Sequence, residues 1–180
     1  MNAITETPTR LAGLKVSALQ ALDHVAAGAP LADVLAELCL AAEQTSAVEM
    51  LASVLLLDAS GRRLVDGAAP SLPADYNAAI NGLEIGPAAG SCGTAAHYGE
   101  AVFVDDIKTD PLWSDFRDLA LKHGLRACWS TPITDENGKI LGTFANYYRL
   151  PRHPRAQDYE AIALLAQAAA QVITASRASS

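Results

Sequence analysis

The sequence predicts an α+β fold in which an antiparallel sheet carries helices on one face. Helical stripes of apolar residues occur near both ends of the chain, and two pairs of apolar segments between them are each joined by a short turn. A hairpin connection requires antiparallel pairing of the strands that it joins. The predicted order is helix, helix, strand pair, irregular middle, strand, helix, strand pair and helix, which is typical of α+β layers.

The composition indicates one globular domain. The chain has 180 residues, of which 51% are hydrophobic and 18% are charged, so it can build a core and does not resemble a disordered chain. Its formal net charge of −7 and the absence of a basic stripe argue against binding to nucleic acid or to an anionic membrane. The N-terminus has no signal-peptide pattern, and no apolar run approaches the roughly 20 residues of a membrane span. We therefore expect a cytoplasmic protein.

The first half of the chain contains two helices and a hairpin. Residues 1–10 are expected to form a flexible leader, and residues 11–180 a single domain with helices at both ends. The first helix is indicated by apolar residues at three- and four-residue steps, namely Leu11, Leu14, Ala18, Leu22 and Val25. A second helix is expected over residues 31–42. Residues 48–58 and 62–65 are expected to pair as two strands across a turn at 58–61.

The second half begins with a short helix at residues 74–80 and continues with alternating strands and helices. A helix is predicted over residues 113–123, with Gly124 as its end, because glycine tolerates the left-handed conformation that follows many helices. Asn137-Gly138 indicates a hairpin between two strands. The remaining predicted elements are a short strand at 101–105, the two hairpin strands at 126–134 and 139–149, and a last helix whose stripe runs from Ile162 to Ile173.

Four sequence blocks carry a family resemblance. They are G-P-A-A-G-S-C-G-T-A-A from Gly86, V-F-V-D-D-I-K-T-D-P-L-W from Val102, G-L-R-A-C-W-S-T-P-I from Gly124 and I-L-G-T-F-A-N-Y-Y from Ile140. In this order and at this spacing they resemble a bacterial GAF domain, and the resemblance covers roughly residues 31 to 175. GAF domains are mostly small-molecule sensing and dimerisation modules without chemistry of their own.

The resemblance implies a central antiparallel sheet of five or six strands with the terminal helices on one face. An irregular, helix-containing lid over a pocket is implied on the other face. It also implies a homodimer formed through the terminal helices, for which the stripe from Leu11 to Val25 is a candidate seam. The alternative is that this helix folds back on its own sheet. No kinase, cyclase or DNA-binding segment follows residue 175, so output is expected through a signalling partner protein or through a longer sensor.

The glycine-rich segment permits two interpretations. Gly86, Gly90 and Gly93 have the spacing G-x-x-x-G-x-x-G, which matches neither the dinucleotide fingerprint nor the lysine-bearing phosphate loop. Backbone amides there could form an anion-binding nest. We favour a tight turn into a helix, since glycine adopts such conformations without steric cost.

The cysteines raise the one enzymatic alternative. Free methionine-R-sulfoxide reductases also have the GAF fold and a G-x-C-G-T-A segment, and Cys92 matches its cysteine. The family's catalytic cysteine and its further redox cysteine have no counterpart here, because residues 105–116 and 83–91 contain none. Cys128 is expected in a buried strand, where cysteine usually acts as a small hydrophobe. Three widely spaced cysteines, with Cys39 as the third, suggest reduced thiols.

No cofactor or metal is expected. A bilin needs a cysteine next to a histidine, which the chain lacks, and neither C-x-x-C nor H-x-x-x-H metal spacing occurs. His97 and His123 fall near the expected lid but resemble helix-end residues more than haem ligands. Asp106 and Asp110 are interpreted as turn and cap residues, and their neighbour Asp105 completes no calcium-loop pattern.

The expected ligand pocket is apolar with a few polar groups, as small-molecule sites usually are. Alternation along residues 126–134 places Cys128 and Ser130 on one face and Trp129 on the other, without showing which face meets the pocket. By family resemblance the pocket-lining candidates are Phe103, Trp113, Phe116, Cys128, Ser130 and Tyr147. The expected function is non-catalytic sensing of a small ligand, such as nitrate or another small anion, or a cyclic nucleotide. The alternatives are the thiol reductase and a purely structural dimerisation module.

Overall fold

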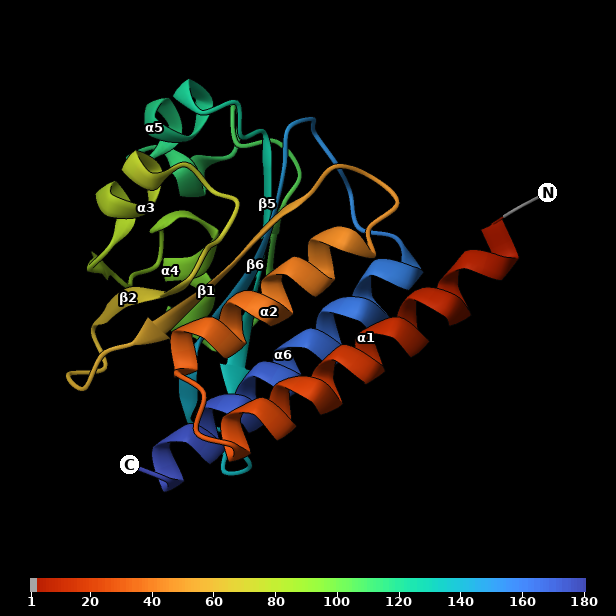
Figure 1. Ribbon diagram of the computed structural model, residues 1–180. Coiled ribbons are helices and arrows are strands. Elements are labelled where there is room, and N and C mark those ends of the chain that lie inside the picture. The colour runs from red at the N-terminus through yellow and green to blue at the C-terminus, as the bar shows by residue number, and fades with distance from the viewer. Residues whose placement is uncertain (1–2) are drawn as a thin grey trace.

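The structure is a computed structural model that describes residues 3–180, with side chains described from Thr9 onward (Figure 1). Its centre is one six-stranded sheet in the order β3-β2-β1-β6-β5-β4, and every neighbouring pair is antiparallel. The strands are β1 (Leu51–Leu57), β2 (Arg63–Ala68), β3 (Leu83–Glu84), β4 (Val102–Val104), β5 (Ala127–Thr134) and β6 (Ile140–Tyr148). The sheet thus has the six antiparallel strands that the resemblance implied.

Helices cover both faces of the sheet. The three long helices α1 (Ala3–Ala26), α2 (Leu31–Gln44) and α6 (Ala156–Ala178) lie together on one face (Figure 1). Residues 72–125 contain α3 (Ala74–Ile80), α4 (Gly90–Tyr98), the 3₁₀ turn η1 (Pro111–Trp113) and α5 (Arg117–Lys122). These short elements lie over the other face, and we call them the lid. The α+β class and the expected distribution of helices are therefore confirmed.

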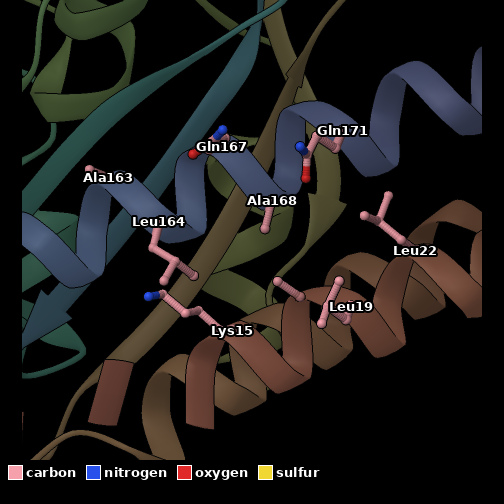
Figure 2. A pocket seen from close by; sticks show the side chains of 9 residues that line it. Lys15, Leu19, Leu22, Ala163, Leu164, Gln167, Ala168 and Gln171 are labelled. Atoms are coloured by element: carbon pink, nitrogen blue, oxygen red, sulfur yellow. The ribbon is translucent and has the colours of Figure 1, made fainter. Parts of the chain in front are cut away.

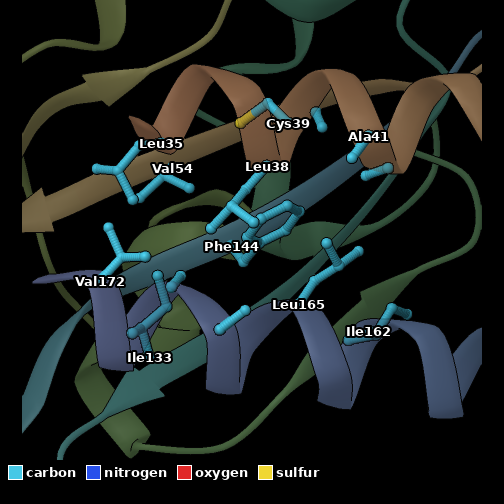
Figure 3. Packing of buried hydrophobic residues seen from close by; sticks show 14 of the residues in the cluster. Leu35, Leu38, Cys39, Ala41, Val54, Ile133, Phe144, Ile162, Leu165 and Val172 are labelled. Atoms are coloured by element: carbon cyan, nitrogen blue, oxygen red, sulfur yellow. The ribbon is translucent and has the colours of Figure 1, made fainter. Parts of the chain in front are cut away.

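The helix face of the sheet carries the larger hydrophobic core. Phe144 of β6 points into the space between α2 and α6, where Leu38 and Leu165 approach it from the two helices (Figure 3). All three side chains are almost fully buried. Burial of a Leu or Phe side chain contributes about 1.5–3 kcal/mol, so this layer accounts for much of the stability of the fold.

Two elements differ from the sequence prediction. Residues 3–10 of the expected leader belong to α1, while residues 1–2 lie outside the described residues. The helix expected over residues 113–123 is divided into η1 and α5. The carboxylate of Asp110 accepts a hydrogen bond from the Leu112 amide and starts a separate 3₁₀ turn. Phe116, at φ −121°, breaks the helical path before α5 begins. Gly124, at φ +72°, follows α5 as predicted.

The apolar stripe of α1 packs within its own protomer. Leu14 and Val25 are buried in the helix-side core, and Leu11, Ala18 and Leu22 pack against its edge. The stripe packs against α6 and α2 of the same chain, so α1 lies on these two helices. The exposed apolar side chains of α1 are instead Val16 and Leu19, with exposed fractions of 55% and 64%.

Among the described helices, α6 alone is long and apolar enough to cross a membrane. Of its most apolar 18-residue stretch, 50% is buried inside the protein. This is how a core helix of a globular domain also behaves, so the feature gives only weak evidence for membrane insertion.

Candidate functional site

Hydroxyl groups form a row on the lid face of the sheet. In the register of the central strands, Ser130 of β5 and Ser53 of β1 both lie opposite Ala145 of β6. Thr143, two residues from Ala145, faces the same side. All three hydroxyl-bearing residues are fully buried, and their side-chain oxygens have no conventional hydrogen-bond partner within residues 9–180. Buried polar groups are normally paired, so this row of hydroxyls can bind a water molecule or a ligand. We call the row formed by Ser53, Ser130 and Thr143 the floor.

A short hydrogen-bond chain fixes the lid above this floor. The hydroxyl of Ser91, in the first turn of α4, donates to the carbonyl oxygen of Cys128 over 2.8 Å. The indole nitrogen of Trp113 donates to the same hydroxyl over 3.0 Å. These two bonds connect α4, η1 and β5, and they direct the next residue, Cys92, toward the sheet.

The thiol of Cys92 lies among hydrogen-bonding groups of the floor. The Cys128 thiol, followed by the hydroxyls of Ser130, Thr143 and Tyr147, lowers the pKa of Cys92 to about 7 against the opposing effect of burial. The N-terminal end of helix α4 also favours a negative charge at this position. Burial and the adjacent Cys92 raise the pKa of Cys128 well above its usual range. Cys92 is therefore the more acidic thiol of the pair.

Cys128 differs from the sequence interpretation. We expected Cys128 to act as a small hydrophobe in a buried strand, with no redox partner for Cys92. Cys128 is buried, but its side chain interacts with that of Cys92 across the lid–sheet boundary. The two cysteines are distant in sequence, so only the packing of α4 on β5 brings them together. Cys39, by contrast, belongs to the helix-side core.

Two tyrosines join the lid to the central strand. The hydroxyl of Tyr76 in α3 donates to the hydroxyl of Tyr147 in β6 over 3.1 Å. Their rings meet edge to face, with centroids 5.8 Å apart. Burial raises the pKa of both side chains well above the usual range. Both hydroxyls are therefore neutral over the physiological range.

The cavity between lid and sheet is small. It has a volume of about 20 Å³, which is room for roughly one water molecule. The ligand-sized pocket implied by the resemblance is therefore closed in this conformation. The cavity is lined by Leu55, Tyr76, Ile80, Leu83, Ala89, Gly90, Ser91, Cys92, Trp113, Phe116 and Tyr147.

Five of the six nominated residues face this region. Trp113, Phe116 and Tyr147 line the cavity. Cys128 belongs to the lid-side cluster, and Ser130 shares its side of β5.

Phe103 lies on the other face and is a correction to the prediction. It pairs with Trp129 across β4 and β5, and directly paired residues share a face of the sheet. Its ring packs against Trp129 and Tyr159, with centroid distances of 6.2 and 5.1 Å. The strand β4 is so short that its sequence pattern does not determine its register, which is why the prediction failed.

Sequence reasoning missed Tyr76, Ser53 and Thr143. Tyr76 is in a short helix whose packing depends on the tertiary structure. The other two had a usable signal, because Ser53 and Thr143 interrupt strands that are otherwise almost entirely apolar. A small polar residue at the centre of a buried strand marks a position where a hydrogen-bonding partner is needed.

The other candidate motifs have structural roles. Gly90, at φ +65°, belongs to the tight turn that leads into α4, as predicted. Asp106 pairs with Arg126 at 3.0 Å, which lowers the pKa of its carboxyl group, and it also accepts a hydrogen bond from the Lys108 amide. Asp110 caps η1. Within residues 3–180, no three His, Cys, Asp or Glu side chains are arranged to hold a metal ion.

A second concave region is an open groove between α1 and α6, on the outer side of the helix layer (Figure 2). Its volume is about 500 Å³, and its walls are mostly apolar with Lys15 and two glutamines at the edge. Figure 2 shows Leu19 and Leu22 on α1 opposite Leu164 and Ala168 on α6.

Residues 28–174 match the family model of the GAF domain. The chain belongs to the GAF domain family. This match agrees with the six-stranded sheet, the terminal helices on one face and the lid on the other.

One relative of this GAF domain is a sensor. Over 149 residues, 83% of the chain, it is 41% identical to the methyl sulfide methyltransferase-associated sensor of Methanosarcina acetivorans. The aligned region is only 15% of that protein's length. The chain therefore matches only one part of that much longer relative.

Solved structures share the fold at low sequence identity. The free methionine-R-sulfoxide reductase of Neisseria meningitidis, solved with its substrate, has a TM-score of 0.75 at 17% identity, covering 100% of this chain and 97% of that chain. The GAF domain of a Coxiella burnetii phosphoenolpyruvate-protein phosphotransferase has a TM-score of 0.73 at 18% identity, covering 93% and 96%. These similarities show the fold and do not distinguish a binding module from an enzyme.

Proposed function

We propose that this GAF domain is a non-catalytic sensor that binds a small ligand between the lid and the sheet. The observation that carries the proposal is the sensor relative, which is 41% identical over most of the chain. The buried hydroxyls of Ser53, Ser130 and Thr143 support a binding floor. Within residues 9–180 their oxygens have no nitrogen or oxygen partner, while those of Ser130 and Thr143 lie beside the Cys92 thiol, so each can donate to an anion or accept from a polar ligand. Nitrate, other small anions and cyclic nucleotides are the first candidates.

In this proposal the structure shows the lid in a closed conformation. A cavity of about 20 Å³ cannot hold nitrate or a nucleotide, so binding requires the lid to move. The lid consists of short elements, and the Tyr76–Tyr147 bond is one of its attachments to the sheet. A ligand that binds only the open arrangement would shift the population toward it.

The signal would pass through β6 to the terminal helices. Tyr147 faces the lid, whereas its neighbours Phe144 and Tyr148 belong to the core beneath α2 and α6. Movement of this strand therefore reaches both faces of the sheet. A signalling partner protein would respond to the terminal helices, and we place the protein in the cytoplasm.

The α1–α6 groove is the surface that we assign to homodimerisation. Leu19 and Val16 leave apolar area exposed beside it, and a second copy of α1 would cover that area. Analytical ultracentrifugation of the wild type and of Leu19→Glu tests this assignment. The variant is expected to shift toward the monomer, and a monomeric wild type would contradict it.

Thermal unfolding with a panel of probes tests ligand binding. The panel contains sodium nitrate, sodium sulfate, cyclic AMP and cyclic di-GMP, with sodium chloride at equal ionic strength as the control. A ligand at about 100 times its Kd stabilises the native state by about 2.7 kcal/mol. We expect at least one probe to raise the Tm of the wild type and to do so less in Ser130→Ala. A panel without any effect would favour the structural dimerisation module, which the small cavity also supports.

The second candidate is a thiol reductase, which the contact between Cys92 and Cys128 favours. In that reaction two thiols would become a disulfide while a sulfoxide is reduced to a thioether and water is released. Incubation of the reduced protein with free methionine sulfoxide, followed by measurement of methionine, tests it. Turnover that is lost in Cys92→Ser would establish the enzyme and contradict the non-catalytic proposal.

A further inference from the structure

We propose that Cys92 and Cys128 form a reversible disulfide with each other when hydrogen peroxide enters the space between the lid and the sheet. This makes the pair a redox-responsive modification site, separate from the binding of a non-covalent ligand.

The packing of α4 on β5 places the two cysteines together. The hydroxyl of Ser91, the residue before Cys92, is bonded to the backbone carbonyl of Cys128 over 2.8 Å. Cys92 and Cys128 belong to the same buried cluster, and the Cys128 thiol is near enough to lower the pKa of Cys92. A disulfide needs the sulfurs to approach to about 2.05 Å, so its formation requires rotation of the side chains or a shift of α4.

The surroundings give the two thiols different roles. Cys92 lies in the first turn of α4, and the hydroxyls of Ser130, Thr143 and Tyr147 are arranged around its sulfur. These groups and the helix end stabilise a thiolate, which is the nucleophilic form of cysteine. Cys128 is fully buried in β5, and this burial raises the pKa of its thiol. Cys92 is therefore the attacking thiol and Cys128 the resolving thiol.

The cavity favours a small oxidant. Cys92 is one of its lining residues, and the volume of about 20 Å³ is close to that of one water molecule. Hydrogen peroxide needs only a slight opening of the lid to reach the sulfur. Bulky hydroperoxides and oxidised glutathione would need the lid to open fully.

The chemistry balances in two steps. The Cys92 thiolate attacks one peroxide oxygen, the O–O bond breaks, and hydroxide leaves and is protonated to water, so that Cys92 becomes a sulfenic acid. The Cys128 sulfur then attacks the Cys92 sulfur, the S–O bond breaks, and a second water leaves with the Cys128 proton. In total, two thiols and one hydrogen peroxide give one disulfide and two waters.

Counting of thiols in the full chain tests the proposal. The reduced chain has three cysteines, all without a disulfide. After peroxide treatment and unfolding, we expect one remaining thiol, and peptide mapping without reductant should show a Cys92–Cys128 linkage that dithiothreitol reverses. Cys39→Ser is the matched control, because Cys39 lies in the helix-side core and its replacement should leave the loss of two thiols unchanged.

Variants separate the roles of the two cysteines. In Cys128→Ser, Cys92 should stop at the sulfenic acid, which dimedone labels, whereas Cys92→Ser should remain unlabelled. Ser130→Ala should slow the oxidation by about tenfold if the hydroxyl supports the thiolate. Peptide mapping of the oxidised wild-type chain needs no variant, so it still tests whether the disulfide forms if a variant does not fold.

Three results would overturn the proposal: three thiols that persist in excess peroxide, a linkage that includes Cys39, and disulfides only between chains. The outcome is independent of the ligand panel. A disulfide can form in a protein that binds no nitrate or nucleotide, and binding of such a probe does not require the cysteines.

Discussion

The hydroxyl of Tyr76 in the lid donates a hydrogen bond to the hydroxyl of Tyr147 in the central strand β6 over 3.1 Å. Both side chains are almost completely buried, so water does not replace this bond when one partner is removed. It therefore connects the stability of the lid to that of the sheet.

Replacement of Tyr76 by Phe should destabilise the protein and loosen the lid. The change leaves the Tyr147 hydroxyl with fewer partners in a buried site, which typically costs about 1–3 kcal/mol. Urea unfolding measures the free energy. Tyr98→Phe is the control, since Tyr98 is exposed and should change the stability by less than about 0.5 kcal/mol. Equal effects of the two variants would contradict a role of the bond.

Replacement of Ser91 by Ala should affect three elements at once. It removes the donor to the Cys128 carbonyl and the acceptor for the Trp113 indole. We expect a loss of about 1–3 kcal/mol together with a change in tryptophan fluorescence, because the environment of Trp113 changes. Ser60→Ala, in an exposed turn, serves as the control. An unchanged emission spectrum and unchanged stability would show that the hydrogen bonds of Ser91 with Cys128 and Trp113 do not hold the lid on the sheet.

Replacement of Asp158 by Asn should be strongly destabilising. Asp158 is buried at the start of α6, where it accepts from the Arg155 amide over 2.9 Å and pairs with Arg152 at 3.1 Å. The Arg152 guanidinium also stacks on Trp129 and Tyr148, 5.4 and 5.1 Å from the ring centroids. Breaking a buried ion pair by removing one partner costs about 3–5 kcal/mol.

Thermal or urea unfolding of Asp158→Asn beside Glu160→Gln checks this prediction. Glu160 is two residues from Asp158 and lies on the exposed side of α6, so its variant should unfold like the wild type. A cost below about 1 kcal/mol for Asp158→Asn would mean that the cluster behaves as an exposed surface pair.

Stability should decrease in alkaline solution. Burial raises the pKa of Tyr148 from 10.0 to about 12, so the folded protein keeps a proton that the unfolded chain releases. The raised pKa of Tyr148 stabilises the folded protein fully below pH 10, and this stabilisation is lost as the pH rises toward 12. For two pKa units at about 1.4 kcal/mol each, it amounts to about 3 kcal/mol.

Unfolding free energies at pH 8, 10 and 11 for the wild type and Tyr148→Phe test the alkaline effect. Tyr148→Phe should reduce the slope above pH 10 without abolishing it, because burial also raises the pKa of Tyr76 and Tyr147. Identical slopes would show that Tyr148 does not contribute.

The sequence predicted the elements better than their faces. The short helix at residues 74–80 and the end of α5 at Gly124 agree with the structure because local turn chemistry determines them. Alternation along β5 correctly separated Cys128 from Trp129. It did not show which face meets the lid, since both faces are covered and apolar. Phe103 was assigned to the wrong face because β4, with 3 residues, is too short for alternation to determine its register.

The site itself depends on long-range packing. The contact of Cys92 with Cys128 and the bond between Tyr76 and Tyr147 join segments far apart in the chain, so no local pattern reports them. The volume of the cavity is equally invisible in the sequence, because it is the small remainder after large side chains have packed.

Native-state amide hydrogen exchange tests the central claim most directly, namely that the lid opens over an otherwise intact sheet. Local opening lets amides exchange with a free energy below that of global unfolding. We predict that amides of α3 and α5 exchange with opening free energies at least about 2 kcal/mol below those of β6, and with a weaker dependence on denaturant than global unfolding. If the lid and β6 exchange together, only through global unfolding, the lid is a fixed part of a structural module and the proposed sensing mechanism is wrong.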